Sequence, residues 1–324
     1  MNNINKLLLI SCLSTLCSCD VAISSGENSS PISPIGSESA SNDSSSAIEN
    51  DGIDNKAQVI VLMGQSNMEG ESYRIHLEKH ISKNKFLEYQ NGYKDVPISY
   101  HIPWNPAQQS RGHFLPTALG QGGQDDRFGP EVGIAEYIHN KGYENVYLVK
   151  YAYGGTTLRK NWRSPSSGGQ VGELYSGAVE YILKAMTVLE NMNLYPEIQA
   201  ICWMQGESDS DGANLNAYDG KYYELEKNFI ADLRNDLAYY GNPLGIGFVD
   251  AGISSCSYWR FHQELNADKE RISQEDELNV YFPTYDLEYK NEPSYGADDA
   301  HYDSVSEIIL GNRFGEYLEQ FLNR

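Results

Sequence analysis

The sequence predicts an α/β protein with a central sheet of five parallel strands, and three observations predict it. Short apolar runs rich in β-branched residues recur along the chain, and longer segments with apolar residues at helical spacing separate them. Glycine and polar residues follow several of these runs directly, as they do at the carboxyl edge of open α/β sheets. Beyond an N-terminal part that lacks folded character, about 270 residues remain, which fits one large domain.

The N-terminal part is predicted to be a signal and a tether. Residues 1–18 have the profile of a secretory signal, because their apolar run is too short to cross a bilayer. The run ends Leu16-Cys-Ser-Cys19, which resembles a bacterial lipoprotein signal with Cys19 as the lipidated residue; an ordinary signal peptide is the alternative. Residues 19–56 are rich in serine and acid and predict a disordered tether. We therefore expect a membrane-anchored lipoprotein, facing the periplasm or the cell surface, with one domain over residues 57–324.

The net charge indicates which partners the protein can bind, and the cysteine count bears on disulfide formation. A net charge of −21 and a pI near 4.6 argue against nucleic acid, whose binding needs clustered lysine and arginine. We expect a non-anionic ligand, and membrane contact only through the lipid anchor. In the folded domain Cys202 and Cys256 remain, and the sequence leaves open whether they pair or are buried free thiols.

The first predicted strand leads to a candidate nucleophile. The apolar run 59–63 ends in Gly64-Gln-Ser-Asn-Met68, so Ser66 lies just beyond the strand end. A serine hydroxyl becomes an effective nucleophile only when a base takes its proton and a carboxylate orients that base. The sequence must supply both partners elsewhere.

A long irregular excursion, residues 69–126, follows the serine. A segment of this length inside a compact domain is usually functional, and it is expected beside Ser66. It holds four histidines, but their spacing matches no recurrent ligand pattern, so no metal site is predicted. A helix is predicted over 128–138, where a proline stands at its start.

The second strand, residues 145–152, ends in Tyr153-Gly-Gly-Thr-Thr157. A glycine there leaves its N–H open to a ligand, which makes Gly154 a candidate donor to an oxyanion. Arg159 and Trp162 follow in a loop that either walls the substrate pocket or is simply solvated, and the local sequence does not decide between these.

The third strand, residues 197–204, ends in Gln205-Gly-Glu-Ser-Asp209. The Gln205 amide can donate to an oxyanion, and Glu207 is either a second carboxylate or a helix cap. The remaining predicted elements are helices over 173–192, 218–240, 254–274 and 304–322 and strands over 244–250 and 278–282.

Asp298-x-x-His301 precedes the last helix. Two intervening residues allow one tight loop to present both side chains, so that the carboxylate holds the imidazole while the imidazole faces Ser66. Asp299 and Glu207 are rival carboxylates for the orienting role, and the sequence does not decide between the three.

Together, these motifs resemble those of the SGNH (GDSL-like) hydrolases, and more narrowly the branch of sialate O-acetylesterases and carbohydrate esterase family 6 acetylxylan esterases. The resemblance covers nearly all of residues 57–324. The motifs that carry it are Gly64-Gln-Ser-Asn-Met68, Phe128-Gly-Pro-Glu131, Gly154-Gly-Thr156, Trp203-Met-Gln-Gly-Glu-Ser-Asp209 and Asp298-x-x-His301.

The resemblance implies a flavodoxin-like three-layer α/β/α fold, no cofactor and removal of O-acetyl groups from sugars, with acetylxylan or acetylated sialic acid as substrate. It implies that Ser66 is the nucleophile, His301 the base and acid, and Asp298 or Glu207 the supporting carboxylate. The implied oxyanion hole consists of the Ser66 and Gly154 N–H groups and the Gln205 amide, and we expect Gln65, Asn67, Arg159 and Trp162 to contact substrate. A non-catalytic glycan-binding lipoprotein is one alternative, although binding would not require these groups together. A lipase or thioesterase of the same fold is another, but it would need an extended apolar channel in place of polar, aromatic loops.

Overall fold

The computed structural model describes residues 55–211, 219–292 and 296–324. The predicted signal, Cys19 and nearly all of the tether lie outside these residues. The first strand begins at Lys56, one residue before the predicted start of the domain. No helix in the described ranges combines the length and apolar character needed to cross a membrane.

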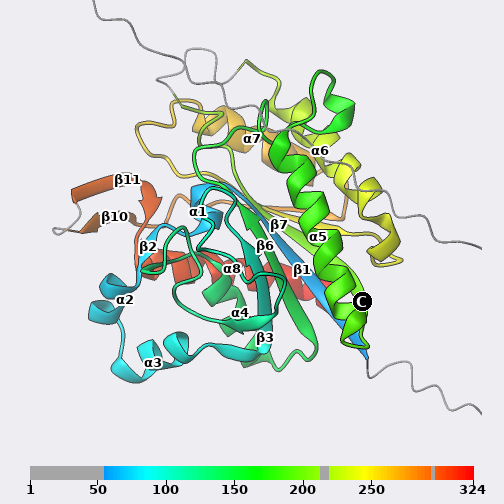
Figure 1. Ribbon diagram of the computed structural model, residues 1–324. Helices are drawn as coiled ribbons and strands as arrows, with labels where there is room; N and C mark the ends of the chain where they lie inside the picture. The colour runs from blue at the N-terminus through cyan, green and yellow to red at the C-terminus, as the bar shows by residue number, and fades with distance from the viewer. Residues whose placement is uncertain (1–54, 212–218, 293–295) are drawn as a thin grey trace, which may run out of the picture. The chain divides into compact units, whose positions relative to one another are not determined.

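The centre of the domain is a seven-stranded sheet in the order β4-β3-β6-β1-β7-β8-β9 (Figure 1). Neighbouring strands are parallel throughout, except that β4 pairs with β3 in the antiparallel sense. The strands are β1 (Lys56–Gly64), β3 (Tyr93–His101), β4 (Leu115–Thr117), β6 (Val146–Ala152), β7 (Tyr195–Met204), β8 (Gly247–Ala251) and β9 (Asn279–Phe282).

The predicted count of five strands was wrong, although each of the five is present. The two additional strands, β3 and β4, lie within the excursion that looked irregular in sequence. β3 contains Pro97 and two exposed charged residues near its start, and a proline normally argues against a strand. Here Pro97 faces Pro116 of the edge strand β4, where the ladder is irregular, so the missing N–H breaks no regular pairing.

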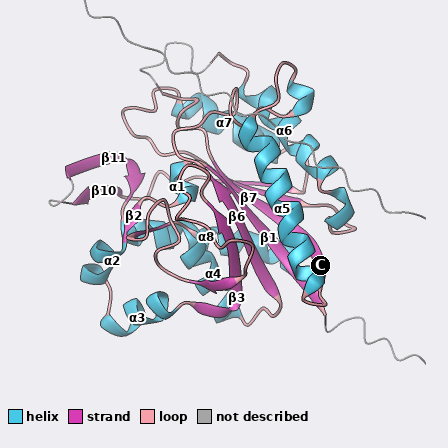
Figure 2. Cartoon of the chain, viewed as in Figure 1, coloured by secondary structure: helices cyan, strands magenta, loops and turns pink. Residues whose placement is uncertain are grey.

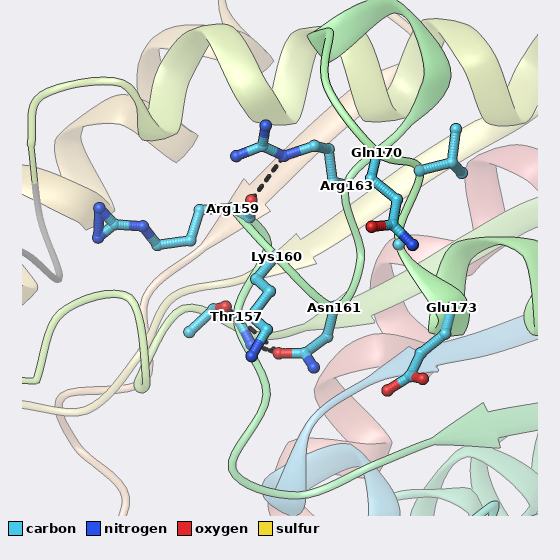
Figure 3. A pocket seen from close by; sticks show the side chains of 9 residues that line it. Thr157, Arg159, Lys160, Asn161, Arg163, Gln170 and Glu173 are labelled. Atoms are coloured by element: carbon cyan, nitrogen blue, oxygen red, sulfur yellow. Dashed lines mark hydrogen bonds between the residues drawn. The ribbon is translucent and has the colours of Figure 1, made fainter.

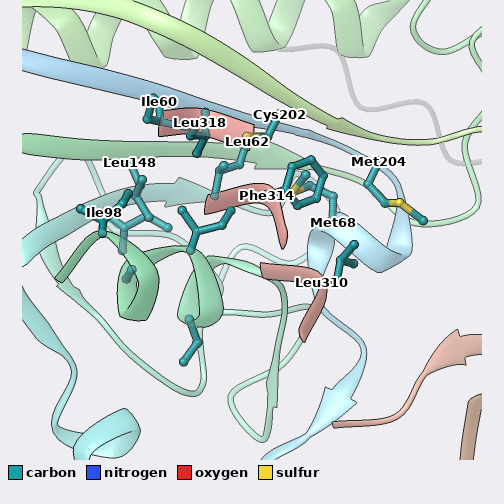
Figure 4. Close-up of a cluster of buried hydrophobic side chains, with 14 of the residues drawn as sticks. Ile60, Leu62, Met68, Ile98, Leu148, Cys202, Met204, Leu310, Phe314 and Leu318 are labelled. Carbon is teal, nitrogen blue, oxygen red and sulfur yellow. The ribbon is translucent and has the colours of Figure 1, made fainter. Parts of the chain in front are cut away.

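Helices cover both faces of the sheet (Figure 2). On one face α4 and α8 pack on a core that includes Ile60, Leu62 and Phe314 (Figure 4). On the other face α5, α6 and α7 pack on a second core that includes Val59 and Val61, because successive β1 side chains point to opposite faces. These helices are α4 (Glu131–Lys141), α5 (Glu173–Asn191), α6 (Tyr222–Asp236), α7 (His262–Ser273) and α8 (Ser304–Leu322).

Two of the predicted helices begin where the sequence placed them. α8 begins at the predicted residue, where Asp303 accepts a hydrogen bond from the Ser306 N–H and caps the helix. α5 also begins where predicted, whereas α6 and α7 are shorter than the predicted 218–240 and 254–274. The smaller elements are α1 (Ser66–Glu69), β2 (Ser72–Tyr73), α2 (Arg74–His80), α3 (Lys83–Asn91), β5 (Arg127–Phe128), η1 (Pro165–Ser167), η2 (Ala238–Tyr240), β10 (Tyr289–Glu292) and β11 (Gly296–Tyr302).

A single glycine allows the chain to turn from β1 into the serine. Gly64 has φ +151°, and a Cβ placed on it would lie 2.0 Å from the Met204 carbonyl oxygen of the neighbouring strand. No side chain fits in that space. The close approach of β1 and β7 therefore places Ser66 directly over the carboxyl edge of the sheet.

Candidate active site

A cavity of about 480 Å³ lies at the carboxyl ends of the central strands and holds both Ser66 and His301. Its walls come from α1, the excursion, the segment after β6, the segment after β7, the segment before α7 and the β10–β11 hairpin. The residues that line it are Gln65, Ser66, Glu69, Glu71, Trp104, Tyr153, Gly154, Gly155, Ser208, Trp259, Ala300 and His301.

Ser66 is the first residue of α1, the short helix that follows β1. At a helix start the N–H groups have no partners within the helix, so they are available to a negatively charged group. Among the described residues, no hydrogen bond joins the Ser66 side chain to His301 or to any other group. Catalytic hydrogen bonds are often formed only in the substrate complex, so this geometry is compatible with a nucleophile.

His301 is held by a carboxylate of its own strand. Its Nδ1 lies 2.8 Å from Oδ2 of Asp298, and the other oxygen of Asp298 accepts the Ala300 N–H at 3.1 Å. Both residues lie on β11 and not in a loop, but the β10–β11 ladder is irregular between Asp298 and Tyr302. Such an irregularity redirects side chains, and here it lets residues at positions i and i+3 of a strand meet.

His301 and Lys290 together keep the Asp298 carboxyl group ionised. The Lys290 Nζ lies 2.9 Å from the same Oδ2 that contacts His301. Burial would raise the pKa of Asp298, but the hydrogen bonds and charges of His301 and Lys290 outweigh it and hold the pKa well below its usual value. The carboxylate can therefore keep a proton on Nδ1 of His301 and leave Nε2 free to act as a base. Asp299, one of the rival carboxylates, is exposed.

Glu207, the other rival, is fully buried and does not contact His301 directly. Its Oε1 accepts the Asn67 amide at 2.8 Å, and its Oε2 is buried without a hydrogen-bond partner. Burial raises the pKa of Glu207. Asn67 in turn contacts the Ala300 carbonyl and the Tyr302 N–H, each at 3.4 Å. Glu207 and Asn67 thus tie the helix of Ser66 to the strand of His301.

The Gly154 N–H, expected as an oxyanion donor, already has an acceptor. It donates to Oε2 of Glu69, whose Oε1 accepts the Trp104 indole N–H at 2.8 Å. Glu69 is almost completely buried. Burial raises its pKa to about 7, although the hydrogen bonds from Trp104 and Gly154 oppose the rise. Gly154 itself lies against Ser66, because a Cβ placed on it would be 3.2 Å from the Ser66 Cβ.

The Gln205 side chain does not reach the cavity, and both ends of its amide are already hydrogen-bonded. Its amide nitrogen donates to Asp209 at 2.6 Å and to the Thr156 carbonyl at 3.1 Å, and its oxygen accepts the Tyr222 hydroxyl. Gln205 is fully buried and is not among the residues that line the cavity. Gln65 does line it, and its oxygen accepts the Ser208 N–H at 3.3 Å.

The two residues expected from the loop after β6 lie elsewhere. Trp162 is fully buried in the core, 5.3 Å edge-on from Trp203, and donates to the Thr156 hydroxyl. Arg159 lines a separate cavity of about 860 Å³, together with Lys160 and Arg163 (Figure 3). The structure therefore places neither side chain on the cavity wall beside Ser66.

The sequence reasoning missed Glu69 as a member of the site. It follows Ser66 by three residues, so on a helix it shares a face with the serine, and this spacing was the available signal. Two tryptophans were missed as well, Trp104 within the excursion and Trp259 in the segment before α7. Both line the cavity, which no local pattern indicates.

The described residues contain no group of three or more His, Cys, Asp or Glu side chains that could hold a metal ion. The excursion's histidines have other neighbours: His76 contacts the Ser304 hydroxyl, and His101 stacks on Tyr181. Cys202 and Cys256 are both buried free thiols.

Comparison with known families gives one match, to the family described as SASA, carbohydrate esterase, sialic acid-specific acetylesterase, over residues 56–320. No curated protein matches the chain.

Several solved structures share the fold at low sequence identity. A protein from Arabidopsis thaliana aligns with 18% identity and a TM-score of 0.57, over 82% of this chain and 99% of its own. A carbohydrate acetylesterase from Xanthomonas citri aligns with 13% identity and a TM-score of 0.56, over 82% of this chain and 57% of its own. NanS aligns with 14% identity and a TM-score of 0.54, over 83% of this chain and 98% of its own. At these identities the likeness establishes the fold alone.

Proposed function

Because the chain belongs to the SASA family of carbohydrate esterases, we propose that it removes O-acetyl groups from sugars through a serine acyl-enzyme on a flavodoxin-like scaffold. One observation supports this most strongly. Ser66 and His301 face the same cavity, and Nδ1 of His301 lies 2.8 Å from an Asp298 carboxylate that also pairs with Lys290 at 2.9 Å. A glycan-binding protein would need no such pairing beside a serine.

The proposed reaction has two acyl-transfer steps. In the first, Ser66 Oγ bonds to the acetyl carbonyl carbon while Nε2 of His301 takes the hydroxyl proton. The ester bond to the sugar then breaks, and the sugar oxygen leaves with that proton. In the second, His301 takes a proton from water, whose oxygen attacks the acetyl carbon. Ser66 Oγ leaves and is reprotonated, and acetate is released. Asp298 stabilises the imidazolium that forms in both steps.

We place neutral acetylated sugars ahead of acetylated sialic acid as substrate. None of the described residues that line the cavity is a lysine or an arginine, whereas two of them are glutamates. A sugar carboxylate buried there would lack a cationic partner, and an unpaired buried charge is unfavourable. The exposed part of Trp104 offers an apolar face on which a neutral sugar ring can stack.

Acetate release from acetylated xylan, acetylated sialic acid and an aryl acetate, by the wild type and by Ser66→Ala, tests the proposal. We expect release by the wild type, fastest from the neutral glycan, and none above background by the variant. Full turnover by Ser66→Ala would refute the serine mechanism. Glycan binding without acetate release in both proteins would favour a binding protein.

The sequence also supports a proposed location. The run Leu16-Cys-Ser-Cys19 after a short apolar segment leads us to propose lipidation of Cys19 and a secreted, membrane-anchored protein. Metabolic labelling with a fatty-acid analogue should mark the wild type and not Cys19→Ala. Equal labelling of both would refute the anchor.

A further inference from the structure

Glu69 lies where the proposed reaction would develop negative charge. It is the last residue of α1, one helical turn from Ser66, and its side chain is almost completely buried in the wall of the catalytic cavity. A Cβ placed on Gly154 would lie 3.2 Å from the Ser66 Cβ and 3.3 Å from Oε2 of Glu69. The serine and this carboxylate oxygen therefore abut the same glycine.

The Gly154 N–H can donate one strong hydrogen bond, and Oε2 of Glu69 accepts that bond. An acyl-transfer oxyanion formed on Ser66 would need donors at the same place. The Gln205 amide does not offer an alternative in this structure, because its nitrogen donates to Asp209 and the Thr156 carbonyl. An ionised Glu69 would thus both occupy the donor and repel the oxyanion.

We propose, on the basis of the esterase function above, that Glu69 occupies the oxyanion position in the resting enzyme and that its protonation releases the Gly154 N–H for catalysis. The neutral carboxyl group is a weaker acceptor than the carboxylate, and it carries no charge to oppose the oxyanion. Activity then depends on two groups: His301 must be neutral to accept a proton, and Glu69 must be protonated.

Burial is the main cause of the raised Glu69 pKa, and the charged groups nearby modify it. From the α1–β2 connection, Glu71 approaches the same side of Gly123 and raises the Glu69 pKa, while Arg127 of β5 pairs with Glu71. From β6, Lys150 lowers the pKa, and its own partner is Glu131 of α4 at 2.8 Å. The β10–β11 hairpin carries three further charged or titratable groups on this side of the molecule, Lys290, Asp298 and His301, of which His301 lines the cavity. Burial has the largest effect, and Glu69 titrates near neutral pH with a pKa of about 7.

The test compares the pH dependence of kcat/KM for the wild type and Glu69→Gln, from pH 5.5 to 9.5. For the wild type we expect a fall above about pH 7. For Glu69→Gln, which cannot ionise, we expect no such fall and a kcat/KM at pH 8.5 at least about tenfold above the wild type, since a single oxyanion donor contributes about 100-fold or more. Glu78→Gln, an exposed change on α2, is the matched control and should follow the wild type.

A second variant changes the Glu69 pKa without removing the carboxyl group. Trp104→Phe deletes the indole N–H that stabilises the carboxylate, so the alkaline fall should move to higher pH. The inference is overturned if Glu69→Gln retains the wild-type pH profile, or loses activity by the same factor at every pH. The second outcome would mean that Glu69 only supports the Trp104 loop.

A fluorophosphonate probe separates this inference from the proposed function. Ser66 Oγ bonds to phosphorus, fluoride leaves, and the Oγ proton passes to His301, so labelling needs the oxyanion donors but no sugar. A wild type that is labelled but hydrolyses no sugar ester would refute the proposed substrate class, and the labelling rates of the two proteins against pH would still decide the role of Glu69. A wild type that neither labels nor hydrolyses would refute both.

Discussion

Replacement of Asp298 by asparagine tests the orientation of the proposed base most directly. One oxygen of Asp298 faces the His301 Nδ1 at 2.8 Å and the Lys290 ammonium at 2.9 Å, and the other accepts the Ala300 N–H at 3.1 Å. Every neighbour of the carboxylate is thus a donor. An asparagine must direct its NH₂ group toward one of them, because only one of its two terminal atoms accepts.

Either orientation of the amide has a cost. If the NH₂ group faces His301, it stabilises the tautomer with the proton on Nε2, which cannot accept a proton from Ser66. If it faces the Ala300 N–H, two donors oppose each other and the irregular part of the β10–β11 ladder that positions His301 is disturbed. In both cases the imidazolium loses its negative partner, and we expect kcat to fall about 10⁴-fold, or roughly 5.5 kcal/mol of transition-state stabilisation. Lys290, which is nearly buried, also loses its ionic partner, so we expect about 1–3 kcal/mol of lost stability.

The assay is acetate release under saturating substrate, with a thermal unfolding curve for each protein. Asp299→Asn is the matched control: the same change at the next, exposed residue should leave kcat within about twofold, as is usual for surface substitutions. A fall of less than tenfold for Asp298→Asn in a folded protein would refute the assignment of Asp298 as the orienting carboxylate, and Glu207 would become the candidate to test.

Three further outcomes follow from the geometry. Gly64→Ala should not give soluble protein, because its Cβ would lie 2.0 Å from the Met204 carbonyl oxygen; a yield and melting temperature equal to those of the wild type would contradict the close strand approach. Trp104→Ala should raise KM for acetylated oligosaccharides about tenfold, because loss of the aromatic face removes about 1.4 kcal/mol of packing, while KM for a small aryl acetate changes less; equal effects on both substrates would argue against a stacking role. Burial raises the pKa of Glu207 above its unfolded value, so its contribution to stability is present at low pH and is lost as pH rises through the raised pKa. The melting temperature of Glu207→Gln relative to the wild type should therefore rise from pH 5 to pH 8. A difference that does not depend on pH would show that Glu207 does not titrate in the folded protein.

Local patterns were sufficient for much of the scaffold. The apolar runs at 59–63, 145–152 and 197–204 predicted the three central strands, because strands buried on both faces read as continuous apolar segments. β3 was missed because its proline and charged residues mark a strand near the sheet edge, where one side of the pattern faces solvent. Edge strands leave a weaker local signal than central ones for this reason.

Part of the candidate site could likewise be predicted from the sequence, and part could not. The strand-end positions of Ser66 and Gly154 and the spacing of Asp298 and His301 could be read from the sequence, and these residues lie at one edge of the sheet. The direction of the Gln205 amide could not be read, since it depends on Asp209 and on a hydroxyl contributed by α6. The burial of Trp162 against aromatic residues of β6, β7 and α6 could not be read from the sequence either.

The sequence by itself determined the α/β alternation, the candidate nucleophile after the first strand and the pairing of Asp298 with His301 before the last helix, because each depends on residues close together in the chain. Only the tertiary structure decided which carboxylate contacts His301, which side chains line the cavity, and that Glu69 holds the Gly154 N–H. Those contacts join residues far apart in sequence. Their burial and hydrogen-bond partners arise from packing, and packing is not encoded in any short segment.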